Sequence, residues 1–209
     1  MLKRRHMLSA LLLPFVMQPI LPAMATERGA ALSFVNSTIN AILEVIVASK
    51  PRPETTAALR QIIETRSAFA QLARFASGEY WKIMSEDQRA RFTEALLHYT
   101  AHVYAGYFRA YAGTVEDLRA YVALTGAEDL GPRGILVKSE IRPVNQIAIT
   151  IDWLVSDRSG RIAVSDLVVG GISMAITQRE LITAMFKTRK GDAERLIADL
   201  RAGSEQTIR

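Results

Sequence analysis

The spacing of the apolar residues changes twice along the chain, and this change constrains the fold more than any other feature. Before Gly113 the apolar residues recur every three or four positions, which is typical of amphipathic helices. From there to Gly170 they alternate with other residues, which is typical of half-buried strands. The helical spacing then returns. This order predicts an α+β fold, in which helices pack on a curved antiparallel sheet of about four strands.

Turn and capping residues place the predicted elements along the chain. Pro51 and Pro53 end the first helix, Gly78 ends the third, and the capping box at 85–88 begins the longest one. The segment 118–124 is predicted to be a strand, although the same residues could form a short helix. The other predicted elements are helices at 30–48, 54–64, 67–76, 85–113, 177–188 and 192–202, and strands at 135–142, 146–155 and 162–169.

The first 25 residues have the composition of a secretory signal. Basic residues at 3–5 precede an apolar run at 7–17, and Ala23-Met24-Ala25 has the small residues of a cleavage site. Prolines interrupt this run, which is shorter than the ~20 residues that a membrane span needs. We therefore predict a cleavable signal peptide at 1–25 and a single domain at 26–209. The adjacent Arg4 and Arg5 leave twin-arginine export open as an alternative route.

Charge and cysteine content narrow the class of protein further. Without the signal peptide, 23 basic residues stand against 21 acidic ones, a formal net charge of +2. A nucleic-acid groove needs Lys and Arg clustered along one face, so no nucleic-acid partner is predicted. The chain has no cysteine, and the domain must therefore be held together by packing without disulfides.

Candidate catalytic and metal-binding residues are few. His98 and His102 have the spacing of two zinc ligands, but Tyr99 replaces the glutamate of the zinc-protease motif, and a solvated helix face is the favoured interpretation. Asp152 and Asp166 fall on consecutive predicted strands, where they could pair as general acid and base or simply face solvent. The sequence has no phosphate loop, dinucleotide motif or nucleophile elbow. We predict no metal, no cofactor and no enzymatic activity.

Apolar faces are the remaining feature. Residues of this type ordinarily form a core. A curved sheet covered by helices can also enclose a ligand cavity with the same lining, and composition does not choose between the two. The faces on the longest helix and on one strand are formed by Leu96, Tyr99, Val103, Tyr107, Ile147, Ile149 and Ile151.

Short motifs distributed along the mature chain resemble the MlaC family. In the clearest one, Gly78, Trp81, Gln88-Arg89 and Phe92 match the family pattern GxxW…QR..F. The sequence departs from the family at Gly170, where a glutamate is usual, at Ile162, where a tryptophan is common, and at 148–153, which lacks a Tyr-Arg pair. The other matching segments are Tyr104 with Tyr111-Ala112-Gly113, Val164-Ser165-Asp166-Leu167, Gly171-Ile172-Ser173 with Gln178-Arg179, and Leu196-Ile197 with Leu200.

The resemblance implies a periplasmic phospholipid-binding protein of the lipid-asymmetry pathway. It implies an NTF2-like fold whose apolar cavity holds acyl chains while the head group stays in water. It also implies a monomer that carries a diacyl phospholipid between an outer-membrane lipoprotein complex and an inner-membrane ABC transporter with an MCE-domain subunit. Two alternatives are a carrier of hopanoid or sterol-like lipids with the same fold, and an NTF2-like enzyme that uses Asp152 and Asp166.

The expected lipid-binding residues lie on the apolar faces and in the motif segments. They would shield acyl chains from water, whose exposure costs ~0.8 kcal/mol per methylene. Trp81 is expected either to close one end of the cavity or to pack in the core. The predicted lining residues are Trp81, Phe92, Leu96, Tyr99, Val103, Tyr107, Ile147, Ile149, Ile151, Leu167 and Val169.

Overall fold

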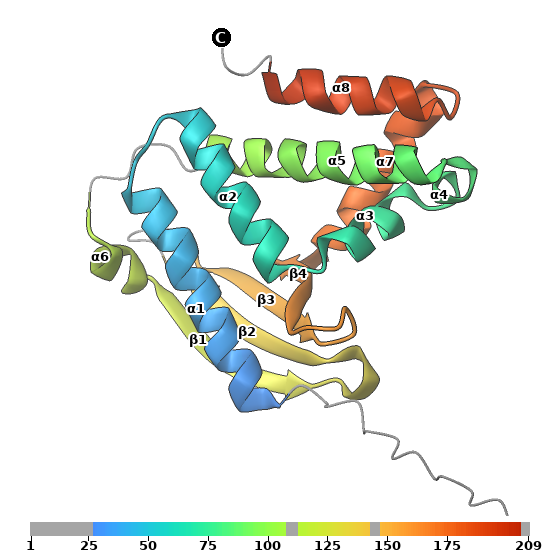
Figure 1. Cartoon of the computed structure of the whole chain (residues 1–209). Coiled ribbons are helices and arrows are strands. Elements are labelled where there is room, and N and C mark those ends of the chain that lie inside the picture. Colours follow the sequence, from blue (N-terminus) through green and yellow to red (C-terminus); the bar gives the residue numbers. More distant parts are fainter. Residues whose placement is uncertain (1–26, 108–112, 143–146, 206–209) are drawn as a thin grey trace, which may run out of the picture.

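The computed structural model describes residues 27–107, 113–142 and 147–205 (Figure 1). The signal peptide predicted at 1–25 lies outside these residues. The helices are α1 (Arg28–Val47), α2 (Arg52–Arg66), α3 (Phe69–Ser77), α4 (Tyr80–Ile83), α5 (Glu86–Tyr107), α6 (Val115–Arg119), α7 (Met174–Thr188) and α8 (Ala193–Glu205), with a 3-10 turn at Gly131–Arg133. The strands are β1 (Val122–Asp129), β2 (Ile135–Ile141), β3 (Ile149–Ser156), β4 (Ala163–Val169) and β5 (Ile172–Ser173).

The five strands form one antiparallel sheet in the order β1-β2-β3-β4-β5, so each strand pairs with its neighbours in the sequence. This confirms the predicted α+β fold and adds the two-residue strand β5 to the four that were expected. Gly170 and Gly171 join β4 to β5, and their φ angles of 57° and 84° suit a tight hairpin turn that other residues rarely adopt. The sheet does not close into a barrel, and β1 and β5 are its edges.

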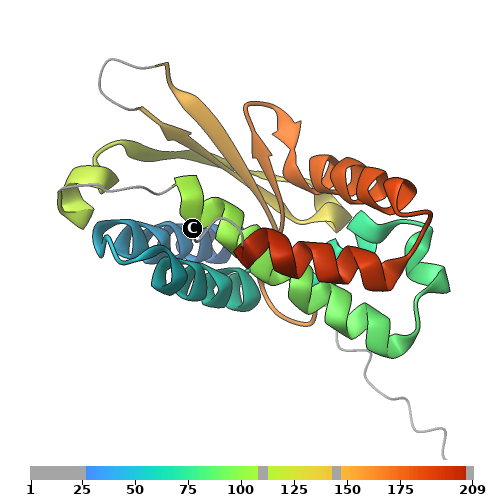
Figure 2. The same ribbon diagram turned by 90° about the horizontal axis from the view of Figure 1, so that it is seen from above.

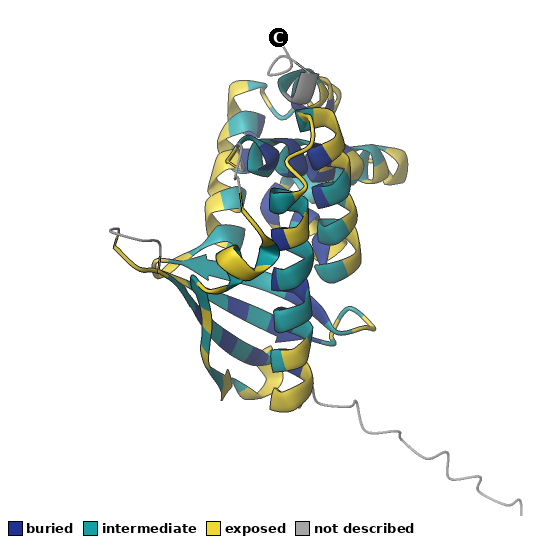
Figure 3. Ribbon diagram, turned by 90° about the vertical axis from the view of Figure 1, so that its left-hand side faces the viewer, coloured by how far each residue is buried: buried dark blue, intermediate teal, exposed yellow. Residues whose placement is uncertain are grey.

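One face of the sheet is covered by α1. Val35 and Ile39 of α1 belong to the same buried cluster as Val137, Trp153 and Val155 of β2 and β3, and we call this cluster the sheet core. Alternate residues of β2 are buried, as expected for a strand with one covered face (Figure 3). In the described part of the chain, α1 is also the one helix that is long and apolar enough to cross a membrane. Length and apolar composition do not distinguish a membrane span from the core helix of a protein that spans no membrane.

A second buried cluster, the helical core, forms between α3, α5, α7 and α8. Phe92 and Leu96 of α5 pack there with Phe186 of α7 and Leu196 of α8. Tyr80 of α4 stacks on Phe186, with ring centroids 4.3 Å apart. Within the described residues the helical core shares no buried residue with the sheet core. The helices and strands that contribute the two cores lie next to each other in Figures 1 and 2. A small third cluster of Leu59, Ala101 and Ala105 joins α2 to α5.

Local signals set the element boundaries. Ser85 and Gln88 form the predicted capping box: the Ser85 amide donates to Gln88 Oε1 at 2.9 Å, and the Gln88 amide donates to Ser85 Oγ at 3.1 Å. The ambiguous segment 118–124 is divided between two elements. Its first residues end α6, which begins with a capping box of Thr114 and Asp117, and its last residues begin β1.

Candidate functional site

A cavity of about 110 Å³ lies where the helical layer meets the sheet. Its walls come from α2, α3, α5, β4 and α7, and therefore from both layers. Most of its lining is apolar, and the described residues that line it include no lysine, arginine or histidine. They are Ile63, Ser67, Ala68, Phe69, Leu72, Thr100, Tyr104, Val164, Ser165, Asp166, Leu167, Met174, Ala175 and Gln178.

One side of the cavity is fixed by hydrogen bonds between the end of α2 and β4. The Ala68 amide donates to the Val164 carbonyl at 2.8 Å. The Arg161 guanidinium donates to three carbonyl oxygens at and just after the end of α2, at 2.5, 2.8 and 2.9 Å. The last carbonyls of a helix have no partner within the helix. Arg161 therefore caps α2 and holds it beside the sheet.

The carboxylate of Asp166 connects β4 to α7. One of its oxygens accepts hydrogen bonds from the Leu167 and Ala175 amides at 2.8 and 2.9 Å, and the other accepts one from the Ser173 hydroxyl at 2.6 Å. Asp166 thus holds the first turn of α7, where a carboxylate is favoured. Asp152 lies on β3 two positions before the residue opposite Asp166, so the two aspartates are not a direct cross-strand pair.

Three of the neutral polar side chains that line the cavity come from α5 and α7. Thr100 Oγ1 of α5 and Gln178 Nε2 of α7 are buried, and neither has a hydrogen-bond partner among the residues that the structure describes. Burial raises the pKa of the Tyr104 phenol, with a further contribution from Tyr107, so Tyr104 is uncharged at neutral pH. The cavity therefore offers neutral hydrogen-bonding groups in apolar surroundings.

Of the predicted lining residues of the sheet, one reaches this cavity. Leu167 lines it. Ile151 and Val169 pair across β3 and β4 on the same sheet face as Leu167, and both are half-buried. Farther from the sheet core, Ile149 is 45% exposed and Ile147 is 89% exposed. Ile151, Val169, Ile149 and Ile147 are thus partly or largely exposed and do not line the cavity.

The predicted lining residues of α5 lie mainly in the helical core. Phe92 and Leu96 are fully buried there, and Tyr99 packs against the same cluster. Val103 is half-buried, and Tyr107 at the end of the helix is 74% exposed. The residues of α5 that line the cavity are those at 100 and 104.

Trp81 packs against the helical core and does not line the cavity. The guanidinium carbon of Arg89 lies 5.4 Å from the centroid of the Trp81 ring, and Arg89 Nε donates to the Trp81 carbonyl at 2.9 Å. These contacts fix the segment between α4 and α5 to the helical core. Of the two roles expected for Trp81, its position matches packing in the core.

Nothing in the sequence indicated that Thr100 belongs to this site, and Tyr104 was indicated only as part of a motif segment. Gln178 also belongs to a motif segment, next to Arg179. The local spacing gives no sign that residues of α5 and α7 meet β4 in one cavity, because that meeting depends on how the two layers pack. The motif segments are therefore the available signal for this site.

The two histidines of α5 lie in different surroundings. His98 is exposed, but His102 is 3% exposed and faces α2, where an Arg52 Nη donates to its carbonyl at 3.2 Å. Burial first, and then Arg52 and His98, lower the pKa of His102. The interpretation of this helix face as solvated is thus wrong for His102, because α2 covers it. Within residues 27–107, 113–142 and 147–205, no three His, Asp or Glu side chains are grouped as a metal site would require.

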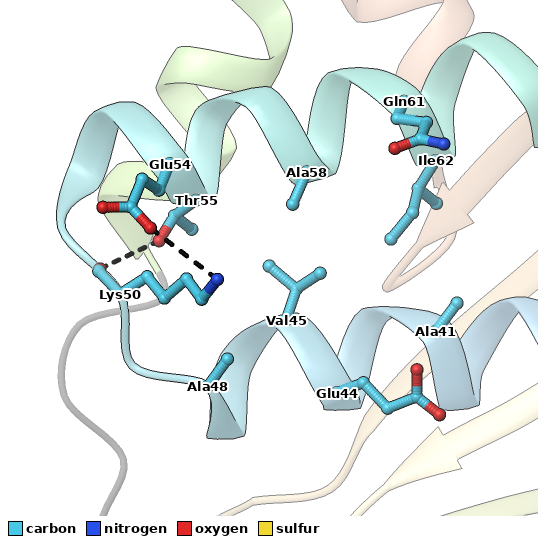
Figure 4. Close-up of a pocket in the computed structure, with 10 residues that line it drawn as sticks. All are labelled: Ala41, Glu44, Val45, Ala48, Lys50, Glu54, Thr55, Ala58, Gln61 and Ile62. Carbon is cyan, nitrogen blue, oxygen red and sulfur yellow. Dashed lines mark hydrogen bonds and ion pairs between the residues drawn. The ribbon is translucent and has the colours of Figure 1, made fainter.

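A second hollow lies between α1 and α2 on the outside of the molecule (Figure 4). It measures about 360 Å³ and is open to solvent. Lys50 and Glu54 form an ion pair of 3.7 Å at one end of this hollow. Glu44 and Gln61 contribute further polar groups to its lining. Although it is larger than the cavity between the layers, a hydrocarbon chain placed there would remain in contact with water.

Comparison with solved structures and family models extends these observations. A phospholipid-binding protein from Ralstonia solanacearum, solved in complex with a phospholipid, shares the fold with a TM-score of 0.66. The two sequences are 17% identical, and the match covers 86% of this chain and 99% of that one. No curated protein sequence gives a significant match. The family model described as MlaC protein matches residues 36–202, from the first half of α1 into α8. The chain thus belongs to the MlaC family.

Proposed function

We propose that this protein is a periplasmic carrier of diacyl phospholipid. It takes up the acyl chains between its two layers and moves, as a monomer, between an outer-membrane lipoprotein complex and an inner-membrane ABC transporter with an MCE-domain subunit. The observation that carries the proposal is an apolar cavity at the junction of two separate cores in a member of the MlaC family. The phospholipid in the structural relative and the signal peptide predicted at 1–25 add support.

Acyl chains need such a shield to cross an aqueous compartment. Each methylene exposed to water costs ~0.8 kcal/mol, so a free phospholipid stays in its membrane. The lining of the cavity is apolar and carries no basic group among the described residues, which suits hydrocarbon better than a charged head group. The head group then remains in water, and the membrane complexes supply the direction of transport.

Lipid entry requires the two layers to separate. Ligand sites typically measure about 300–1,000 Å³, whereas this cavity measures about 110 Å³. Because the sheet core and the helical core share no buried residue in the described part of the chain, they can move apart without opening either one. Leu167, Ile151, Val169 and Ile149 would then line the widened site, with Tyr107 near its mouth.

Mass spectrometry of an organic extract of the purified protein tests the function directly. We expect one diacyl phospholipid per protein molecule. Recovery of a hopanoid instead would replace the proposed ligand class. A protein that arrives empty and takes up no phospholipid from vesicles would contradict the carrier function.

Filling the cavity should reduce lipid occupancy. Ala175 lines the cavity in the first turn of α7, and Ala175→Trp places a large ring where acyl chains would bind. We expect lipid occupancy to fall about tenfold or more, since the ring competes for most of the available space. Ala184→Trp is the matched control, because Ala184 is exposed on the same helix. Equal occupancy of the two variants, measured by native mass spectrometry, would place the ligand elsewhere.

A further inference from the structure

The cavity contains two buried polar atoms whose hydrogen-bonding capacity is unused. Within the described residues, six buried side-chain atoms have no hydrogen-bond partner. Four of them belong to Arg52, Thr56, Arg60 and His102 of α2 and α5. The other two, Thr100 Oγ1 and Gln178 Nε2, are on side chains that line the cavity from two different helices.

Their position indicates a partner from outside the chain. Folded proteins satisfy nearly all buried polar groups, because a buried donor without an acceptor loses its interaction with water and gains nothing. Thr100 and Gln178 come from α5 and α7, and they interrupt walls that are otherwise built from side chains such as Phe69, Leu72 and Met174. A ligand that enters between α5 and α7 would reach both atoms.

The chemistry of the two atoms and of their surroundings selects the ligand group. The Gln178 Nε2 atom can only donate, and the Thr100 hydroxyl can donate or accept, so one acceptor can satisfy both. A phosphate or carboxylate is disfavoured, since the described lining has no cation and the Asp166 carboxylate is part of it. A neutral carbonyl oxygen fits these conditions.

We propose that Thr100 and Gln178 bind an ester carbonyl of the lipid, so that the protein selects acyl-ester lipids over ligands that are hydrocarbon throughout. This inference rests on the proposed carrier function and names a specificity determinant within the same site. It places the ester linkage inside the protein with the acyl chains. The charged head group lies on the water side of that linkage.

A competition between ester and ether lipids tests the inference. The lipid-free protein is mixed with vesicles of equal parts dipalmitoyl phosphatidylglycerol and its di-O-hexadecyl ether analogue, which has the same head group and chain length but no carbonyl. Native mass spectrometry then gives the ratio of the two bound lipids. We expect the ester lipid to be enriched about three- to tenfold, the effect of one well-formed hydrogen bond.

Variants assign the preference to the two side chains. Thr100→Val keeps the shape and removes the hydroxyl, and Gln178→Leu removes the amide. Both should bring the ester-to-ether ratio close to that of the vesicles. Gln71→Leu is the matched control: Gln71 is exposed on α3 and lies outside the cavity lining, so this variant should retain the wild-type ratio.

The outcomes separate the inference from the function on which it rests. If the wild-type protein takes up both lipids in equal amounts, ester selection is overturned and the carrier function stands. If it takes up neither lipid, the carrier function itself fails. Thermal unfolding of the lipid-free proteins is a second test: Thr100→Val and Gln178→Leu should raise the Tm by about 2 °C or more, because each removes an unsatisfied buried group. A lower Tm in both variants would show that the chain itself supplies their partners.

Discussion

Arg91 makes charged hydrogen bonds to two carboxylates. It lies in the second turn of α5, where Nε donates to Asp87 at 2.7 Å, and its two Nη atoms donate to the two carboxylate oxygens of Glu194 in α8 at 2.6 Å each. Gln88 donates to the same carboxylate at 3.0 Å. The hydrogen bond from Arg91 first, and that from Gln88 next, lower the pKa of Glu194 to about 2. One carboxylate thus links the beginnings of α5 and α8.

Removal of this carboxylate should have a pH-dependent effect. The pKa of Glu194 is lower in the folded state than its ordinary 4.5, so the unfolded chain binds its proton more readily and protonation favours unfolding. We expect Glu194→Gln to have a lower Tm than the wild type at pH 7. The difference should stay constant down to about pH 4.5 and shrink as the pH falls toward 2. Calorimetry at a series of pH values measures it, and a difference independent of pH would contradict this account.

At the scale of helices and strands, the sequence predicted most elements because each has a long and regular apolar period. β5 and α4 were missed because two and four residues are too few to show a period. The site was harder to predict for a different reason. The stripe that contains Phe92 and Leu96 shows which side of α5 is buried, and the structure shows that α8 and α7 bury it. The layer against which a helix face packs depends on tertiary structure. The spacing of apolar residues within one helix does not predict it.

Arg161 makes the side-chain hydrogen bonds that hold the end of α2 beside β4. Arg161→Leu removes three hydrogen bonds to backbone carbonyls, and we expect the free energy of unfolding to fall by about 1–2 kcal/mol. Arg158→Leu is the matched control, since Arg158 is exposed in the same turn between β3 and β4. Its effect should stay within about 0.5 kcal/mol. Equal losses in the two variants, measured by denaturant unfolding, would show that Arg161 does not hold α2.

The whole molecule consists of two layers that are each well packed and meet at a less complete junction. Within the described residues, α5 packs mainly on α2, α3 and α8. The Ala68 and Arg161 hydrogen bonds close the junction on the α2 side. A separation of the layers would therefore pivot on the α2 side.

Hydrogen exchange should report this movement. Loading with phospholipid should change amide protection in β4, the start of α7 and the second half of α5, where the cavity is lined. Amides beside Leu196 in the helical core and Val137 in the sheet core should keep their protection, because each core moves as a unit. Exchange measured by mass spectrometry on empty and loaded protein makes the comparison. A loss of protection in either core on loading would show that the site forms by internal rearrangement.

The brevity of β5 limits how other chains could add to the sheet. An open sheet presents unpaired backbone groups at both margins, and these can recruit strands from other chains into aggregates. One edge strand, β5, is only two residues long and is followed directly by α7. The other edge strand, β1, shifts its register with β2 between Leu124 and Gly126. Both features leave little straight edge on which a foreign strand could add, so neither edge of the sheet is a ready template for polymerisation.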